Sequence, residues 1–271
     1  MLYRCARDLV NQKLRRQYTQ FSRVLPLPLS QTIHLKSRIC GAINTMATLD
    51  ETKDIWKKSD AVCFDVDSTV VIDEGIDELA AYLNKGKEVA AWTVKAMDGT
   101  ISYRETLRAR LEIIQPSRQS IETFVKEHPP RFTKGVQELI KALHARDCHV
   151  YLISGGLRSI IEPMAKILDI PNERIYCNRL KFYFNGKYAG FDEDQPTSRE
   201  GGKPEVVRSL KKQCGYKNLV MIGDGATDLE AWPPADAFIG FGGNQVRPKV
   251  KEQSKWFVND FAELTQALKE N

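Results

Sequence analysis

The chain has 271 residues, of which 42% are hydrophobic, and its formal net charge is +5. This apolar content excludes a largely disordered chain, and no apolar stretch is long enough to span a bilayer. Residues 1–48 hold eight Lys and Arg and a single acid, so the remaining chain is slightly acidic and lacks the basic surface typical of nucleic-acid-binding domains.

The segment up to about Thr48 is rich in Arg, almost free of acid and interrupted by Pro26 and Pro28. This pattern fits an organellar targeting peptide, and it equally fits a disordered extension before an effective start at Met46. The expected location is the cytoplasm, and import into a mitochondrion or plastid through this segment is the alternative. The six cysteines form no C-x-x-C pair, which favours reduced thiols packed as small apolar groups.

After this segment, short apolar runs alternate with helical patterns. Five runs predict strands: Ala61–Phe64, His149–Ile153, Leu219–Ile222, Ala237–Gly240 and a weaker Trp256–Val258. Helical patterns such as Val136–Arg146 and Glu205–Gln213 lie between them. Strands that alternate with helices predict an α/β fold with a doubly wound, Rossmann-like parallel sheet.

About eighty residues separate the first two strands, and this stretch contains no convincing strand. Four helical patterns fill it: Ile76–Leu83, Glu88–Ala96, Tyr103–Ile114 and Ile121–Lys126. This is too long for one crossover helix and predicts an inserted helical cap domain. The expected division is a basic extension over 1–48, an α/β core over 49–75 and 139–271, and the cap over 76–138.

Two local patterns follow the second strand. Pro163 lies inside a helical pattern over 157–168, so this helix is either kinked or begins later. Asn185-Gly186 lies between two aromatic-rich runs and predicts a hairpin with a type I′ turn.

Polar residues gather where the apolar strands end. Asp65 and Asp67 follow the first strand, and residues two apart on a strand face the same way, so both can point into one site. Carboxylates this close repel unless a cation or a shared proton intervenes, and Mg²⁺ suits oxygen ligands and phosphate. For an isolated pair, the alternative is an acidic strand end or a helix cap.

Two further clusters occupy equivalent places. Residues 154–156 (Ser-Gly-Gly) follow the second strand, where N–H groups and the hydroxyl can hold phosphate oxygens, although an ordinary turn has the same sequence. Residues 223–228 follow the third strand and bring two more carboxylates for a metal. Lys203 offers a cation to phosphate. Because the carboxyl ends of parallel strands meet at one edge, these clusters should converge in one crevice.

Taken together and in this order, the clusters at 65–69, 154, 203 and 223–228 resemble the four motifs of the haloacid dehalogenase superfamily. Further stretches are similar to phosphoserine phosphatases of the eukaryotic type, from about Ser59 to near the C-terminus. They are the residues 74–79, 95–97, 110–111, 114–118, 152–156 and 179–186.

The resemblance implies hydrolysis of O-phosphoserine to serine and phosphate through an aspartyl-phosphate intermediate, the last step of L-serine biosynthesis. It assigns Asp65 as the nucleophile and Asp67 as the general acid and base. The implied cofactor is Mg²⁺, held by the Asp65 side chain, the Asp67 backbone carbonyl and Asp224, with Asp228 as outer-shell support.

The resemblance also implies a set of substrate-binding residues: Glu74, Met97, Asp98, Arg110, Ser154, Gly155, Gly156, Lys203 and Thr227. Among these, Arg110 suits the substrate carboxylate and Glu74 its ammonium group. Asp98 departs from the family, where a small residue is common, so its role is open. The implied partner is the small substrate alone, without nucleic acid or membrane, and the family likeness suggests a homodimer.

Two other functions fit part of this pattern. Another phosphatase or a phosphotransferase of the superfamily could use the same catalytic motifs, but Glu74 and Arg110 favour an amino-acid substrate over a sugar phosphate. A basic binding module would rely on the N-terminal segment alone, and the charge of the remaining chain argues against nucleic acid.

Overall fold

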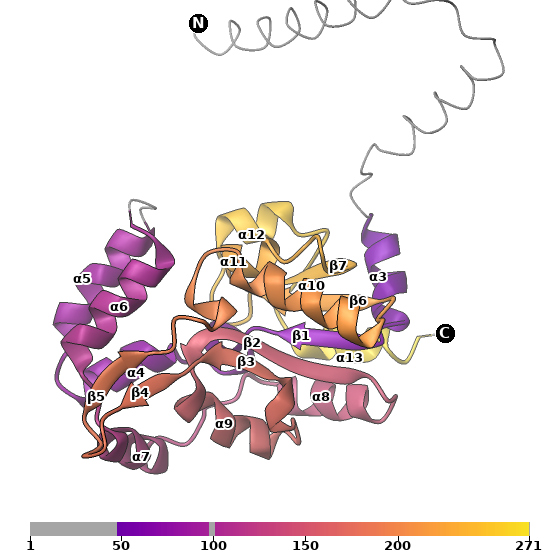
Figure 1. Ribbon diagram of the computed structural model, residues 1–271. Coiled ribbons are helices and arrows are strands. Elements are labelled where there is room, and N and C mark those ends of the chain that lie inside the picture. Colours follow the sequence, from indigo (N-terminus) through magenta and orange to yellow (C-terminus); the bar gives the residue numbers. More distant parts are fainter. Residues whose placement is uncertain (1–47, 98–100, 271) are drawn as a thin grey trace, which may run out of the picture. The chain divides into compact units, whose positions relative to one another are not determined.

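The computed structural model describes residues 48–97 and 101–270, and its centre is a parallel sheet of six strands (Figure 1). In spatial order they are β3 (Ile175–Asn178), β2 (His149–Leu157), β1 (Ala61–Phe64), β6 (Leu219–Gly223), β7 (Ala237–Phe241) and β8 (Trp256–Val258). The chain winds outward from β1 in both directions, so the predicted doubly wound fold is confirmed and its switch point lies between β1 and β6.

All five predicted strands are present, and the structure adds β3, which the apolar pattern did not indicate. This strand has four residues and pairs on one side only, with β2. A short edge strand of mixed polarity carries too little hydrophobic periodicity to be recognised.

Helices cover both faces of the sheet. The first face packs against α3 (Leu49–Lys57), α8 (Val136–His144), α9 (Arg158–Ile167) and α13 (Phe261–Ala267), and the second against α10 (Gly202–Cys214), α11 (Ala226–Leu229) and α12 (Pro248–Gln253). In β1, Val62 and Phe64 enter the first apolar cluster while Ala61 and Cys63 enter the second. Successive side chains of a strand point to opposite faces, so one apolar run supplies both clusters.

Four helices between β1 and β2 build a third apolar cluster of their own. They are α4 (Gly75–Tyr82), α5 (Gly86–Met97), α6 (Tyr103–Ile114) and α7 (Arg118–Glu127). Leu107 and Leu111 of α6 are buried in this cluster. The predicted stretch of cap helices is thus present, whereas α8, which begins at Val136, packs on the sheet instead.

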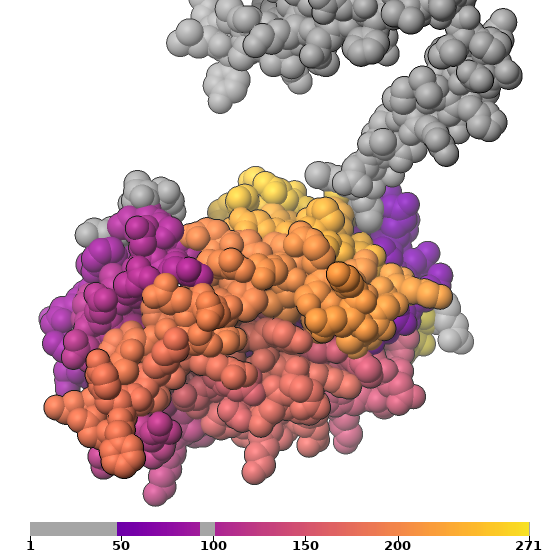
Figure 2. Space-filling model, viewed as in Figure 1, coloured from indigo at the N-terminus to yellow at the C-terminus, as the bar shows by residue number. Residues whose placement is uncertain are grey.

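The hairpin of β4 (Leu180–Phe182) and β5 (Tyr188–Phe191) also joins the cap cluster, through the buried Phe191. It lies in the segment that the sequence assigned to the core. Its two strands pair only with each other, so its aromatic side chains cover α6 rather than the sheet. Figure 2 shows the magenta cap helices and the orange chain around the hairpin in contact.

The expected type I′ turn in this hairpin is wrong. That turn needs positive φ at both central residues, and of Asn185 and Gly186 only the glycine has it, at 79°. Tyr183 and Lys187 close a three-residue loop instead, with Gly186 in the left-handed conformation. For the helical pattern that contains Pro163, the sequence left open whether the helix begins after the proline. α9 begins at Arg158 and contains Pro163, so it does not begin after the proline.

Among residues 48–97 and 101–270, the helices are all too short or too polar to cross a membrane. The predicted targeting segment lies outside the described residues, as does Asp98, and the side chain of Met97 is not described either.

Candidate active site

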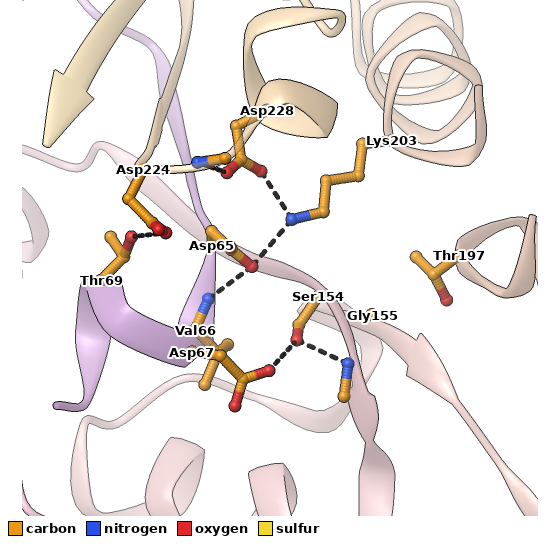
Figure 3. Close-up of polar contacts among 12 residues, drawn as sticks. Asp65, Val66, Asp67, Thr69, Ser154, Gly155, Thr197, Lys203, Asp224 and Asp228 are labelled. Carbon is orange, nitrogen blue, oxygen red and sulfur yellow. Dashed lines mark hydrogen bonds and ion pairs between the residues drawn. The ribbon is translucent and has the colours of Figure 1, made fainter. Parts of the chain in front are cut away.

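A cavity of about 600 Å³ lies between the cap and the carboxyl ends of the strands. Eight of its lining residues come from the predicted set: Asp65, Asp67, Glu74, Arg110, Gly155, Lys203, Asp224 and Thr227. Arg110 comes from α6 of the cap, and the predicted Ser154, Gly156 and Asp228 lie behind this lining. The motif residues of three strand ends therefore surround one space (Figure 3).

The two aspartates reach this space by a different route from the predicted one. β1 ends at Phe64, and Asp67 lies in a tight turn in which Ser68 has a φ of 55°. Strand alternation therefore does not align Asp65 with Asp67. The Asp67 carboxylate accepts hydrogen bonds from the Gly75 N–H at 2.8 Å and the Ser154 hydroxyl at 3.4 Å, which direct it toward β2.

The Asp67 carboxyl group has a pKa well above the ordinary value for an aspartate. Burial makes the largest contribution to this shift, and the nearby carboxylates of Glu74 and Asp65 add to it, so the pKa of Asp67 rises to about 7. The hydrogen bond from the Gly75 N–H and the charge of Lys203 lower the pKa, but by less. A carboxyl group with a pKa near neutrality can both give and take a proton at physiological pH, which is what general acid–base catalysis needs.

Lys203 is nearly buried and lies between two carboxylates. Its Nζ is 2.5 Å from Asp228 Oδ1 and 2.8 Å from Asp65 Oδ1 (Figure 3). Burial alone lowers the pKa of Lys203, but Asp228 and Asp65 outweigh this and raise it above its ordinary value. The side chain therefore remains an ammonium group beside the cavity. Gly202 precedes it because a Cβ there would lie 1.9 Å from the Pro196 carbonyl oxygen.

Three buried carboxylates form a candidate metal centre: those of Asp65, Asp224 and Asp228. One oxygen from each lies within 4.8 Å of the others. Burial and the charge of Asp65 raise the pKa of Asp224, as crowded carboxylates should. This set of hard oxygen donors fits a divalent cation such as Mg²⁺.

The three carboxylates differ in how they are held. Asp224 accepts from Thr69 Oγ1 at 3.1 Å and from Arg247 Nε at 2.8 Å. Asp228 is fully buried, and its oxygens accept from Lys203 and from the Gly225 N–H at 2.9 Å. Both carboxylates therefore have a donor on each oxygen, and Asp228 differs in that its cation, Lys203, also reaches Asp65.

Two cap residues that line the cavity, Arg110 and Thr106, each hold a buried donor atom without a partner among the described residues. Arg110 binds Asp77 Oδ1 through Nη2 at 2.6 Å, while its Nε is buried without a hydrogen-bond partner among the described residues. One helical turn earlier, the buried Thr106 Oγ1 also lacks a partner within the described chain. Buried donors without partners are costly, so both groups are suited to an acceptor that arrives with a ligand.

Glu74 precedes α4 at the rim of the same cavity. Its Oε1 accepts from Ser68 Oγ at 2.9 Å and lies 3.7 Å from Arg247 Nη2. Arg247 thus spans Glu74 and Asp224, yet the sequence did not indicate it. It follows Asp224 by 23 residues in a loop without a motif, and only folding brings it to the site.

Comparison with known proteins gives the site its context. Residues 59–236 match the family model of haloacid dehalogenase-like hydrolases. A phosphoserine phosphatase of Bos taurus is 51% identical over 225 residues, which cover 83% of this chain and 100% of that protein. The chain belongs to the phosphoserine phosphatase family of haloacid dehalogenase-like hydrolases.

Other members of the family extend this similarity. The "Phosphoserine phosphatase, chloroplastic" of Arabidopsis thaliana is 49% identical, and the match covers 80% of this chain and 75% of that one. The solved structure "Substrate bound phosphoserine phosphatase complex structure" is 27% identical, with a TM-score of 0.67 over 77% of this chain and 97% of that chain. The resemblance inferred from the motifs is therefore confirmed.

For a member of this phosphatase family, the cavity contains the groups that phosphoryl transfer requires. Asp65 lies beside the Lys203 ammonium group, which can donate to a phosphoryl oxygen, and Asp67 is a carboxyl with a near-neutral pKa. Ser154 is buried behind them, with its hydroxyl directed to Asp67. Positioned charge of this kind is the main contribution that a protein makes to phosphoryl transfer.

Proposed function

We propose that this chain hydrolyses O-phosphoserine to serine and phosphate, the last step of L-serine biosynthesis, with Mg²⁺ as cofactor. One observation carries the proposal: a single cavity joins the Asp65–Lys203 pair of the core to the unpaired Arg110 Nε of the cap. The first suits a phosphoryl group and the second a carboxylate, and phosphoserine carries both.

In the proposed reaction, an Asp65 oxygen attacks phosphorus while the bond from phosphorus to the serine oxygen breaks. Asp67 gives its proton to that leaving oxygen. It then takes a proton from a water molecule, which attacks the aspartyl-phosphate, releases phosphate and restores Asp65. Lys203 and Ser154 hold the phosphoryl oxygens throughout, and the cap excludes bulk water during the attack.

The proposed metal ligands are the Asp65 side chain, the Asp67 backbone carbonyl and Asp224. Asp228 supports them by holding Lys203 beside Asp65. When bound, Mg²⁺ neutralises charge on the phosphoryl oxygens and on the crowded carboxylates. Asp65 and Asp224 contribute hard oxygen donors from the ends of adjacent strands, which makes them the best placed of these ligands.

The amino-acid part of the substrate is assigned to the cap side. Arg110 Nε and Thr106 Oγ1 meet the carboxylate, and Glu74 meets the ammonium group. Gly155 and Gly156 belong to the phosphate end and Thr227 lines the pocket, while Met97 and Asp98 remain predictions outside the described side chains. The homodimer and the cytoplasmic location, with organellar import as its alternative, also remain predictions.

A panel of phosphate esters tests this function against the other phosphatases of the superfamily. Phosphoserine should give a clearly higher kcat/KM than phosphoethanolamine or a hexose phosphate. A preference for the hexose phosphate would instead support a sugar-phosphate phosphatase or a phosphomutase.

Removal of the metal should abolish turnover and also change the stability of the protein. After chelation we expect activity to return with added Mg²⁺ and Tm to rise, because a ligand at 100 times its Kd adds about 2.7 kcal/mol to the unfolding free energy. Asp224→Asn should lose most of this Tm shift, whereas Asp194→Asn, an exposed carboxylate, should keep it. An unchanged shift in Asp224→Asn would contradict its assignment as a ligand.

Arg110→Ala should weaken binding of substrates that carry a carboxylate. A hydrogen bond to a charged group contributes about 1.5–3 kcal/mol, so KM for phosphoserine should rise roughly 10- to 100-fold. KM for phosphoethanolamine, which lacks the carboxylate, should change far less. Arg118→Ala, on cap helix α7, provides the control, and equal increases for both substrates would reject the assigned contact.

A further inference from the structure

The carbonyl oxygen of Gly155 accepts two side-chain hydrogen bonds. Tyr103 Oη donates at 2.8 Å and Asn178 Nδ2 at 2.7 Å. The tyrosine begins cap helix α6, whereas Asn178 ends edge strand β3 and is fully buried. Asn178 Oδ1 accepts from Thr197 Oγ1 at 3.1 Å, which fixes the orientation of the amide. One donor therefore belongs to the core and the other to the cap.

This carbonyl is connected to the Ser154 hydroxyl through one peptide unit. The Gly155 carbonyl and the Gly156 N–H share a planar trans peptide and point to opposite sides. The Gly156 N–H donates to Ser154 Oγ at 2.8 Å, so a lone pair of the hydroxyl is occupied and its proton is directed elsewhere. That proton is donated toward Asp67 Oδ2, at 3.4 Å.

The contact with the cap depends on glycine at position 155. A Cβ there would lie 2.1 Å from Tyr103 Oη, so any larger residue would displace the phenol from the carbonyl. Burial raises the pKa of Tyr103 to about 12. The phenol therefore stays protonated and remains a donor at neutral pH.

We propose that Tyr103 and Asn178 are positioning residues that hold the Gly155–Gly156 peptide and thereby orient the Ser154 hydroxyl for the phosphoryl group. Asn178 supplies permanent support, and Tyr103 adds its support only while the cap lies against the core. The position of the cap thus controls the geometry of the Ser154–Gly156 segment of β2. This inference rests on the proposed phosphatase function, and it assigns neither residue a contact with the phosphoryl group.

A double-mutant cycle between Tyr103→Phe and Ser154→Ala tests this connection. Loss of one neutral hydrogen bond should lower kcat/KM about 3- to 10-fold in Tyr103→Phe. The loss should be the same for phosphoserine and phosphoethanolamine, because it acts on the phosphate end. In the Ser154→Ala background, Tyr103→Phe should have no further effect. An undiminished loss in that background, or an unchanged kcat/KM in Tyr103→Phe itself, would overturn the proposal.

Asn178→Ala provides a second test, because each donor can hold the carbonyl in part when the other is lost. The double variant with Tyr103→Phe should lose more activity than the product of the two single losses, and strictly independent losses would reject the shared role. Tyr82→Phe is the control, since its hydroxyl donates to Glu127 Oε2 at 3.1 Å within the cap and activity should not change.

Different results would contradict the proposed substrate and the proposed positioning role. If the wild-type protein left phosphoserine intact but hydrolysed a simple aryl phosphate, the substrate assignment would be wrong. The cycle could still be measured with the aryl phosphate, and its coupling would then support or reject the positioning role.

Discussion

Asp65→Asn should abolish phosphate release while the protein remains folded. The amide cannot form the acyl-phosphate, and removal of a covalent nucleophile typically costs several orders of magnitude in rate, so we expect a loss of at least about 1,000-fold. The fold should tolerate the change because the oxygen of the new side-chain amide can still accept from the Val66 N–H and from Lys203, which keeps its ion pair with Asp228.

The measurement pairs single-turnover phosphate release with thermal unfolding. Asp54→Asn, on the exposed side of α3, is the matched control and should retain full activity. Phosphate release by folded Asp65→Asn at more than about 1% of the wild-type rate would contradict the covalent mechanism. A denatured variant would be recognised by its unfolding profile and replaced with Asp65→Ser.

The sheet could be predicted from sequence because its central strands are buried on both faces. Val62 and Phe64 face one helical layer while Ala61 and Cys63 face the other, so β1 is a continuous apolar run. The same argument fails for edge strand β3, which is short and paired on one side. The hairpin was recognised as a hairpin, but its packing on the cap could not be predicted because aromatic strands suit either domain.

The site could be predicted wherever the chemistry is local in sequence. Residues 154–156 form the last part of β2, which runs to Leu157, and residues 223–228 begin at the end of β6, so parallel topology alone brings them to one edge. Arg247, Tyr103 and Asn178 lie in segments without a motif, and each reaches the site through contacts that only folding makes. Their roles depend on partners far away in sequence, which periodicity cannot reveal.

Loss of the buried ion pairs of Lys203 should strongly reduce both the stability and the activity of the protein. Lys203→Met leaves Asp228 fully buried without its cation and removes the charge that we assign to the phosphoryl group. Breaking a buried pair by removing one partner costs about 3–5 kcal/mol of unfolding free energy. We expect activity to fall by at least about 100-fold, since the site loses a fixed charge that stabilises the transition state.

A second substitution separates the structural part of this effect from the catalytic part. Asp228→Asn in the Lys203→Met background removes the unpaired charge while its amide oxygen can still accept from the Gly225 N–H, so chemical denaturation should show much of the lost stability restored. Activity should stay low, because no cation returns to the side of Asp65. Recovery of turnover together with stability would mean that Lys203 only neutralises Asp228, and it would remove the lysine from the phosphate-binding set.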